Sequence, residues 1–252
     1  MDINLLSILL LSSAGFFAGI INTLAGGGSN LTLPALIVFG LPADVANGTN
    51  RVAIVLQCLV GVKGFDKHNS LDRPAIIPIL VPTIIGGIVG AGAAAIIPVS
   101  FLKPLLLLSI LAMSILILVR PATISPELGT PTLSPSVSKK GWWALFGAGV
   151  YGGFVQAGVG FILLVALAGV LRYDLTRANA LKMACTLAFT CVALGVFAIF
   201  DQVAWLPGLI MAAGSMTGAH IAVKFAVKAS QNVIKWFLFA MTVVAVVAGF
   251  LA

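Results

Sequence analysis

Apolar segments, many of them close to twenty residues long, follow one another along most of this chain. Ten are found, at about 4–24, 30–41, 45–63, 74–97, 101–120, 141–157, 160–171, 175–199, 203–225 and 232–251. A helix needs about twenty apolar residues to cross the hydrocarbon core of a bilayer. The pattern therefore predicts a polytopic membrane protein.

Composition supports the same conclusion and favours helices over a barrel. Hydrophobic residues make up 60% of the chain and charged residues 8%, and the mean hydropathy is +1.16. A water-soluble domain of this composition would expose large apolar patches. A membrane barrel would show segments of about ten residues that alternate apolar and polar side chains, whereas these runs are continuous. The expected fold class is all-α, a bundle of membrane helices.

Two of the segments, 30–41 and 160–171, are too short to cross the membrane upright, and each follows a glycine-rich break. The first break reads Ala-Gly-Gly-Gly-Ser-Asn over 25–30, and the second reads Gln-Ala-Gly-Val-Gly over 156–160. These segments are either full crossings or re-entrant hairpins. Interrupted hydrophobic segments at corresponding points of two halves are a sequence pointer to a transporter's substrate site.

The chain also reads as a duplicated unit. Asn47 aligns with Asn179, 132 residues later, and Gly86 aligns with Gly214, 128 residues later. Each half holds five segments, an odd number, so the second half is expected to enter the membrane from the opposite side. We therefore predict a first repeat half over 1–120, a cytoplasmic linker over 121–140 and a second, inverted half over 141–252.

Charge predicts the orientation of the chain. When the segments alternate between the two sides, nearly all the Lys and Arg residues fall on one side, and the other side receives Lys103, Asp2, Asp44 and Asp201. By the positive-inside rule the basic side is cytoplasmic, which predicts a multi-pass protein of the cytoplasmic (inner) membrane with both termini outside.

Several motifs resemble one known family. These are Gly-Gly-Gly-Ser-x-Leu-x-Leu-Pro-Ala-Leu over 26–36, Gly-Leu-Pro over 40–42, Ala-Asn-Gly-Thr-Asn-Arg over 46–51, Gly-Gly-Phe-Val-Gln-Ala-Gly-Val-Gly-Phe over 152–161 and Arg-Ala-Asn-Ala-Leu-Lys over 177–182. Together they resemble the sulfite exporter TauE/SafE family of membrane proteins. The resemblance implies a transporter of small anions such as sulfite, other sulfur oxyanions or organosulfonates, acting in export. The second half lacks the Gly-Thr-Asn run, so the two half-sites are not expected to be chemically equivalent.

Two cations carry the site hypothesis. Arg51 and Lys182 lie inside segments at nearly the same repeat position, and neither has an acidic residue on the next helical turn. A cation inside a membrane segment costs about 3 kcal/mol or more, so it usually faces a cavity or a partner. Unpaired positive charge is what an anion site requires. The alternative is that both side chains snorkel to an interface.

The glycine breaks add backbone donors to this hypothesis, because a helix that starts at Ser29 or Gly160 presents amides and a positive dipole end to an anion. The expected substrate-binding residues are Gly26, Gly27, Gly28, Ser29, Asn30, Asn47, Thr49, Asn50, Arg51, Gln156, Gly158, Gly160, Asn179 and Lys182. Asp44 is either the N-terminal cap of its helix or a proton-coupling residue. Gly86, Gly90, Gly214 and Gly218 are expected to serve close helix packing.

Other classes of function fit less well. No HExxH, GxSxG or GxxxxGK[ST] motif occurs, so an intramembrane enzyme is disfavoured and coupling to an ion gradient is expected. Three scattered cysteines predict no metal site, and no cofactor is expected. The expected partners are a small anion and the lipid bilayer, with no nucleic acid, and a homo-oligomer is compatible with the pattern. We expect a secondary carrier with alternating access, and an anion channel is the main alternative.

Overall fold

A computed structural model describes residues 4–119 and 131–228 of the chain, and every regular element in these ranges is a helix. The elements are α1 (Leu5–Leu24), α2 (Ser29–Val38), α3 (Ala43–Lys67), α4 (Arg73–Ile96), α5 (Val99–Val119), α6 (Lys139–Phe154), α7 (Val159–Leu164), the π-helical turn η1 (Val165–Val170), α8 (Leu175–Ile199) and α9 (Trp205–Lys228). The all-α prediction is confirmed. Nine of the ten expected segments correspond to helices, and the tenth, 232–251, lies outside the described residues.

Five of the described helices are long and apolar enough to cross a membrane, and they are α1, α3, α4, α8 and α9. The helices of the short segments are too short to do so. α2 has 10 residues, and α7 with η1 covers Val159–Val170. At about 1.5 Å per residue these helices are only about 15–18 Å long.

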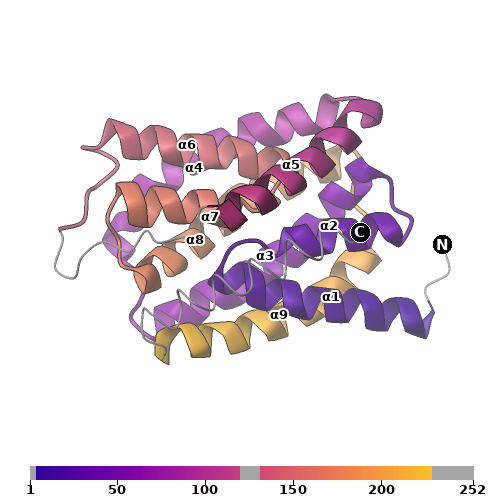
Figure 1. The fold of residues 1–252 in the computed structure, drawn as a ribbon, viewed down its shortest axis with the longest axis horizontal. Helices are drawn as coiled ribbons and strands as arrows, with labels where there is room; N and C mark the ends of the chain where they lie inside the picture. The colour runs from indigo at the N-terminus through magenta and orange to yellow at the C-terminus, as the bar shows by residue number, and fades with distance from the viewer. Residues whose placement is uncertain (1–3, 120–130, 229–252) are drawn as a thin grey trace.

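Each short helix runs back along the helix before it, so the chain forms two helical hairpins (Figure 1). α1 and α6 enter from opposite ends of the bundle, and α2 and α7 return toward the end from which each entered. Both turns use a left-handed residue just after the helix: Gly26 has φ +90° and Gln156 has φ +71°. The amides of these two residues donate to Ile21 O at 3.0 Å and Tyr151 O at 3.3 Å, so both helices end in the same kind of C-terminal turn.

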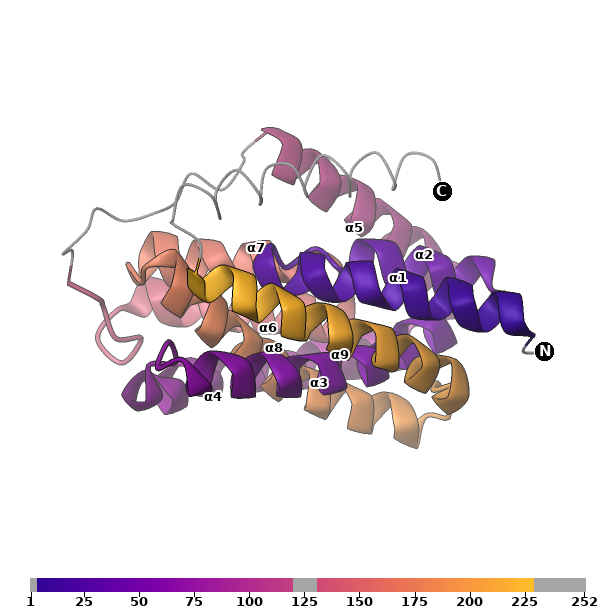
Figure 2. The same ribbon diagram turned by 90° about the horizontal axis from the view of Figure 1, so that it is seen from below.

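The long helices pack in two pairs through glycine. α1 packs against α9, and α4 packs against α6. A methyl group built at Gly19 or Gly218 would overlap the backbone of the partner helix, and the same holds for Gly90 and Gly153. The prediction that Gly86, Gly90, Gly214 and Gly218 serve close packing is therefore confirmed. Since lipid is as apolar as leucine, such backbone proximity is a main source of attraction between membrane helices. α3 and α8 cross between the two pairs, and α5 lies at one side of the bundle (Figure 2).

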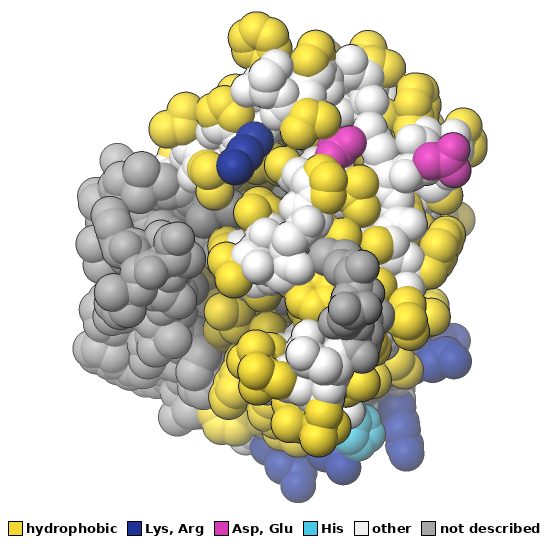
Figure 3. Space-filling view, turned by 90° about the vertical axis from the view of Figure 1, so that its right-hand side faces the viewer, with side chains coloured by type: hydrophobic (Ala, Val, Ile, Leu, Met, Phe, Trp, Pro, Cys, Tyr) yellow, Lys and Arg dark blue, Asp and Glu magenta, His cyan; other side chains and the backbone are white. Residues whose placement is uncertain are grey.

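The charges gather at one end of the bundle. α4, α6 and α8 begin there and α3 and α9 end there, so the end carries Lys67, Arg73, Lys139, Arg177 and Lys228. Figure 3 looks at the opposite end, where α1 begins; its surface is largely hydrophobic with scattered acidic groups and a Lys or Arg side chain, and further basic side chains show only at the lower edge of the view. The segregation of charge expected from the sequence is thus present in the fold.

The close packing of α4 on α6 through Gly90 can be tested by substitution, with Gly92 of the same helix as the control. A Cβ at Gly90 would overlap the Val150 carbonyl oxygen, whereas a Cβ at Gly92 has nothing within 4 Å. Gly90→Ala should lower the free energy of unfolding by about 1–3 kcal/mol because α4 and α6 must separate. Gly92→Ala should leave it within about 1 kcal/mol, with any change in the stabilising direction. Thermal unfolding in detergent measures both, and equal midpoints for the two variants would contradict this packing.

Candidate functional site

The two glycine breaks are in direct main-chain contact inside the bundle. The Gly160 amide donates to the Gly26 carbonyl at 3.2 Å, and a Cβ on either glycine would overlap the Cα of the other. Residues 21–30 and 155–160 are buried throughout. The breaks can approach this closely only because neither Gly26 nor Gly160 has a side chain. The broken helix ends α1, α2, α6 and α7 are thereby held at one place in the interior.

Arg51 of α3 binds the C-terminal end of α6. Its guanidinium donates to the carbonyls of Gly152 at 2.5 Å and Gly153 at 3.0 Å, and also to the side chain of Gln156. Asn47, one turn earlier, accepts from Arg51 at 3.1 Å and donates to the Phe154 carbonyl at 2.9 Å. Arginine thus caps the helix that ends at the second break, where carbonyls have no partner within their own helix.

Lys182 of α8 does the same for α1. Its ammonium donates to the carbonyls of Asn22 at 3.0 Å and Thr23 at 2.9 Å, and to Asn179 Oδ1 at 2.7 Å. The pair Asn179–Lys182 on α8 therefore matches the pair Asn47–Arg51 on α3. In each case the cation joins a helix of one half of the chain to the broken helix of the other half and also donates to the asparagine about one turn before it; only Asn47 itself bonds the broken helix.

Neither cation snorkels. The exposed fraction is 0% for Arg51 and 1% for Lys182, and both side chains end on interior carbonyls, so the interfacial alternative is wrong. The ion pairs of residues 4–119 and 131–228 are Arg73–Asp66 and Arg177–Asp174, both of partly exposed side chains. Within these residues, only neutral dipoles therefore surround the two buried charges, and their positive field is not cancelled by a carboxylate.

Other predicted site residues fall into a second group on α2 and α3. Asn50 accepts from Thr32 Oγ1 at 2.7 Å and donates to Ser29 Oγ at 3.2 Å, which joins the start of α2 to α3. Thr49 instead accepts from the Ala204 amide at 2.9 Å and holds the start of α9. The structure thus brings Asn50 and Ser29 together, but it places Thr49 against a different element.

The two short helices differ at their N-termini. α2 begins at Ser29 as expected, whereas α7 begins at Val159, one residue before Gly160. The expectation of a free amide at Gly160 is wrong, because that amide binds Gly26 O. The amides of Gly28 and Ser29 make no hydrogen bond within the described part of the chain. Gly27, which follows the left-handed Gly26, packs close to the Phe161 ring, and Gly158 is the left-handed residue that precedes α7.

Asp44 does not cap α3. The N-terminal cap position is Pro42, no side chain caps this helix, and Asp44 lies in its first turn. The capping alternative is therefore wrong. Its Oδ1 is buried without a hydrogen-bond partner among the described residues, so the carboxyl group is only partly satisfied.

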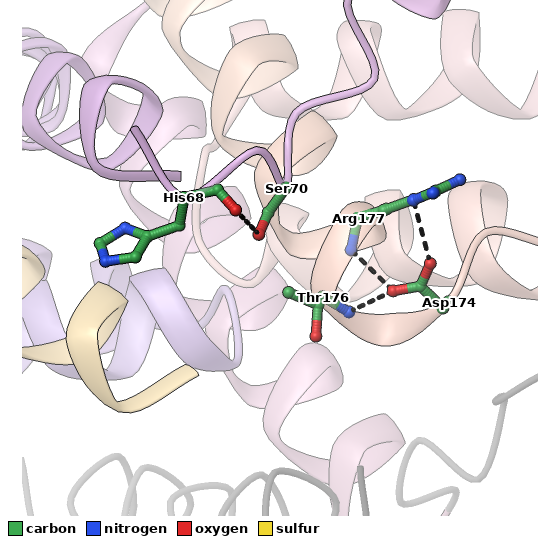
Figure 4. A network of polar contacts seen from close by, with 5 residues as sticks. All are labelled: His68, Ser70, Asp174, Thr176 and Arg177. Carbon is green, nitrogen blue, oxygen red and sulfur yellow. Dashed lines mark hydrogen bonds and ion pairs between the residues drawn. The ribbon is translucent and has the colours of Figure 1, made fainter. Parts of the chain in front are cut away.

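Arg177 belongs to the basic end of the bundle and not to the interior. Asp174 caps α8 by accepting from the Thr176 and Arg177 amides at 3.1 and 3.0 Å. The Arg177 side chain, 53% exposed, lies 3.5 Å from the same carboxylate. Figure 4 shows this cap beside His68 and Ser70, which follow α3. The Asp174 carboxylate therefore stabilises the start of α8, and Arg177 pairs with that carboxylate at the surface.

Sequence reasoning missed several residues of the interior, among them Asn22, whose carbonyl accepts from Lys182 at 3.0 Å. The Phe197 ring lies 5.3 Å from Arg51 Cζ, in a cation–π arrangement, and the Thr190 hydroxyl donates to Gln156 at 3.3 Å. Thr23 supplies a carbonyl to Lys182. Only Phe197 had a signal in the sequence, because Phe65 precedes it by 132 residues at the repeat spacing and both rings are fully buried.

Two surface pockets are described, and no predicted site residue lines either one. A groove of about 600 Å³ lies between α1 and α2, next to Leu10, Phe17, Leu31 and Val38. A second pocket of about 420 Å³ lies beside Pro78 and Trp142. Neither the buried cations nor residues 25–30 and 156–160 line these two pockets.

The cap geometry predicts that Arg51 is needed for stability. Arg51→Met keeps the volume but leaves the carbonyls of α6 without donors, so we expect a loss of at least about 3 kcal/mol in the free energy of unfolding, since a charged hydrogen bond contributes about 1.5–3 kcal/mol. Arg177→Met is the matched control, because an exposed ion pair contributes at most about 1 kcal/mol. Thermal unfolding in detergent compares the two, and similar losses would show that Arg51 does not cap α6.

Comparison with known proteins places the chain in a family. The model of the family "Sulfite exporter TauE/SafE" matches residues 11–249. A Haemophilus influenzae protein named "Probable membrane transporter protein" is 28% identical over 241 residues, covering 93% of this chain and 91% of that protein. "Probable membrane transporter protein ORF9" of Sinorhizobium sp is 25% identical and covers 88% and 84%, and "Probable membrane transporter protein YfcA" of Escherichia coli is 22% identical and covers 86% and 80%. No solved structure shows significant similarity. The chain belongs to the sulfite exporter TauE/SafE family of membrane transporters.

Proposed function

We propose that this protein is a secondary carrier that exports a small anion, such as sulfite, another sulfur oxyanion or an organosulfonate, across the cytoplasmic membrane. The observation that carries the proposal is the pair of buried cations, Arg51 and Lys182, which have no carboxylate partner among the described residues. An unpaired intramembrane charge is expensive and is typically retained for a substrate or ion pathway.

The two halves of the chain are proposed to be inverted repeats. The alignment of Asn47 with Asn179 supports this, as do the reciprocal contacts in which α3 caps α6 and α8 caps α1. The packing of α1 on α9 and of α4 on α6 follows the same exchange of halves. In this arrangement the halves 1–120 and 141–252 rock about the central breaks, and 121–140 links them on the cytoplasmic side.

An oxyanion suits the groups at the centre. It would compete with main-chain carbonyls for the N–H donors of Arg51 and Lys182, because both kinds of acceptor offer oxygen and the anion also offers charge. The expected cradle adds Gly26, Gly27, Gly28, Ser29, Asn30, Asn47, Thr49, Asn50, Gln156, Gly158 and Asn179, without Gly160, whose amide is used by Gly26. Loss of a cap frees the end of a broken helix, so binding of the anion and movement of the halves are coupled.

Coupling to protons is assigned to Asp44. Its buried, unpartnered Oδ1 lies on the same helix as Arg51 and near the end of the bundle that carries few cations.

Transport of sulfite into proteoliposomes tests the charge roles. Arg51→Gln with Lys182→Gln retains amide donors for the helix ends but removes both charges, so we expect saturable uptake to fall at least tenfold. Lys67→Gln with Arg73→Gln removes two charges from the basic end and should leave uptake within about twofold. Undiminished uptake by the first double variant, purified as a folded protein, would refute the proposal.

The same preparation separates a carrier from a channel. A carrier shows an initial rate that saturates with substrate, whereas a channel shows unitary currents in a planar bilayer. Unitary anion currents from the purified protein would favour the channel alternative.

Orientation is tested by cysteine labelling in intact cells. In a Cys191→Ser background, where the remaining cysteines Cys58 and Cys185 are buried, Ser136→Cys marks the basic end and Ser100→Cys marks the other end. With the basic end in the cytoplasm, an impermeant maleimide should label Ser100→Cys in intact cells and Ser136→Cys only after permeabilisation. The reverse pattern would place the termini inside.

A further inference from the structure

We infer that the two breaks have different roles: the first break, between α1 and α2, is the seat of an oxyanion, and the second break is a closed structural clamp. This inference rests on the proposed transport of an anion and assigns its primary contacts to Lys182, Asn179 and Thr23. Thr23 is absent from the cradle expected from the sequence.

The second break is almost fully satisfied by the protein itself. Four of the five N–H donors of Arg51 are used, by Gly152 O, Gly153 O, Gln156 and Asn47, and only Nε lacks a partner. Two amides at the start of α7 are used as well, since Val159 donates to Gln156 O at 3.2 Å and Gly160 donates to Gly26 O, whereas the Ala157 and Gly158 amides have no partner among the described residues. An anion would find few free side-chain donors here.

The first break has the opposite character. Thr23 Oγ1, Asn179 Nδ2 and both polar atoms of the Asn30 side chain are buried and have no hydrogen-bond partner in the described part of the chain. These residues are 0%, 0% and 2% exposed, so bulk water does not satisfy them. The Gly28 and Ser29 amides at the start of α2 also lack partners there. Buried polar groups are rarely left unpaired, and a cluster of them requires an explanation.

Two of these residues, Thr23 and Asn179, contact the Lys182 ammonium. Lys182 contacts the carbonyl of Thr23 and the side-chain oxygen of Asn179, so the free hydroxyl and the free amide belong to residues already at its head group. A Cβ at Gly28 would overlap Asn22, whose carbonyl also accepts from Lys182, and this places the start of α2 at the same point. Helix α2 has 10 residues, so its N-terminus carries a full dipole.

The chemistry of the cluster selects an acceptor with negative charge. A hydroxyl, an amide NH₂ and main-chain N–H groups beside an ammonium all donate, and a group with several anionic oxygens accepts from all of them. Sulfite, sulfate and sulfonates share this feature. A lysine ammonium is a compact point charge whose three donors rotate freely, so exchanging one carbonyl for a substrate oxygen disturbs it less than it would the fork of Arg51.

Binding of sulfite, sulfate and methanesulfonate to the purified full chain in detergent tests the inference, by calorimetry and by the rise in thermal midpoint. Thr23→Val should weaken the tightest of these anions at least fivefold and should not lower the midpoint without ligand, because the hydroxyl has no partner to lose. Thr23→Ser keeps the hydroxyl and should bind within about twofold of the unmodified protein. Thr83→Val is the matched control, since that buried hydroxyl bonds the Ile79 and Leu80 carbonyls of its own helix and makes no contact with Lys182, Asn179 or Thr23, and it should also bind within about twofold.

The outcomes separate this inference from the proposed function. Unchanged affinity in Thr23→Val, or equal loss in Thr23→Ser, would overturn the seat at the first break while leaving anion transport in place. Absence of binding of all three anions to the unmodified protein would overturn the proposed function and the seat with it. Loss in Thr23→Val alone supports the seat.

Discussion

The structure depends on how the main-chain carbonyls are satisfied where α1 and α6 stop inside an apolar bundle. A bilayer provides no water to carbonyls at that depth, and each one left unpaired costs several kcal/mol. Arg51 and Lys182 supply the missing donors from α3 and α8. The breaks and the buried charges therefore depend on each other. The carbonyls at the ends of α1 and α6 stabilise the two cations, and the cations of α8 and α3 stabilise these helix ends.

The same arrangement fixes how closely the helices approach. The breaks touch through Gly26 and Gly160, and the outer pairs of helices pack through glycines such as Gly90 and Gly218. Close backbone packing of this kind forms rigid units that move as bodies more easily than they deform. These units are the pairs α1–α9 and α4–α6, and each joins a helix of one half of the chain to a helix of the other half.

Arg51 and Lys182 cap corresponding helix ends in the two halves, but their side chains differ in chemistry. Arg51 is a planar fork whose donors are nearly all used, and its surroundings include Gln156 and the Phe197 ring. Lys182 is a point charge beside unpaired donors of Thr23 and Asn179. The missing Gly-Thr-Asn run in the second half had predicted unequal half-sites, and the contacts of the two cations give this inequality a physical form.

Much of the fold could be predicted from the sequence. Apolar segments of about twenty residues lead to helices in a bilayer on length alone, and Gly26 and its neighbours mark a break because consecutive glycines do not sustain a helix. Burial of Arg51 and Lys182 followed from the cost of charge in a membrane segment, and the packing role of Gly90 followed from its spacing of four residues from Gly86 on one helical face. Family membership followed from motifs at both breaks.

Only the tertiary structure decided what the cations and breaks contact. That Arg51 caps α6 and Lys182 caps α1, that the Gly160 amide is used by Gly26, and that Thr23 stands at the Lys182 head group all depend on residues more than a hundred positions apart. A sequence records which groups need a partner, since that follows from charge and hydrogen-bonding capacity. Which partner each group finds depends on how the helices pack in three dimensions, and local sequence patterns do not contain that information.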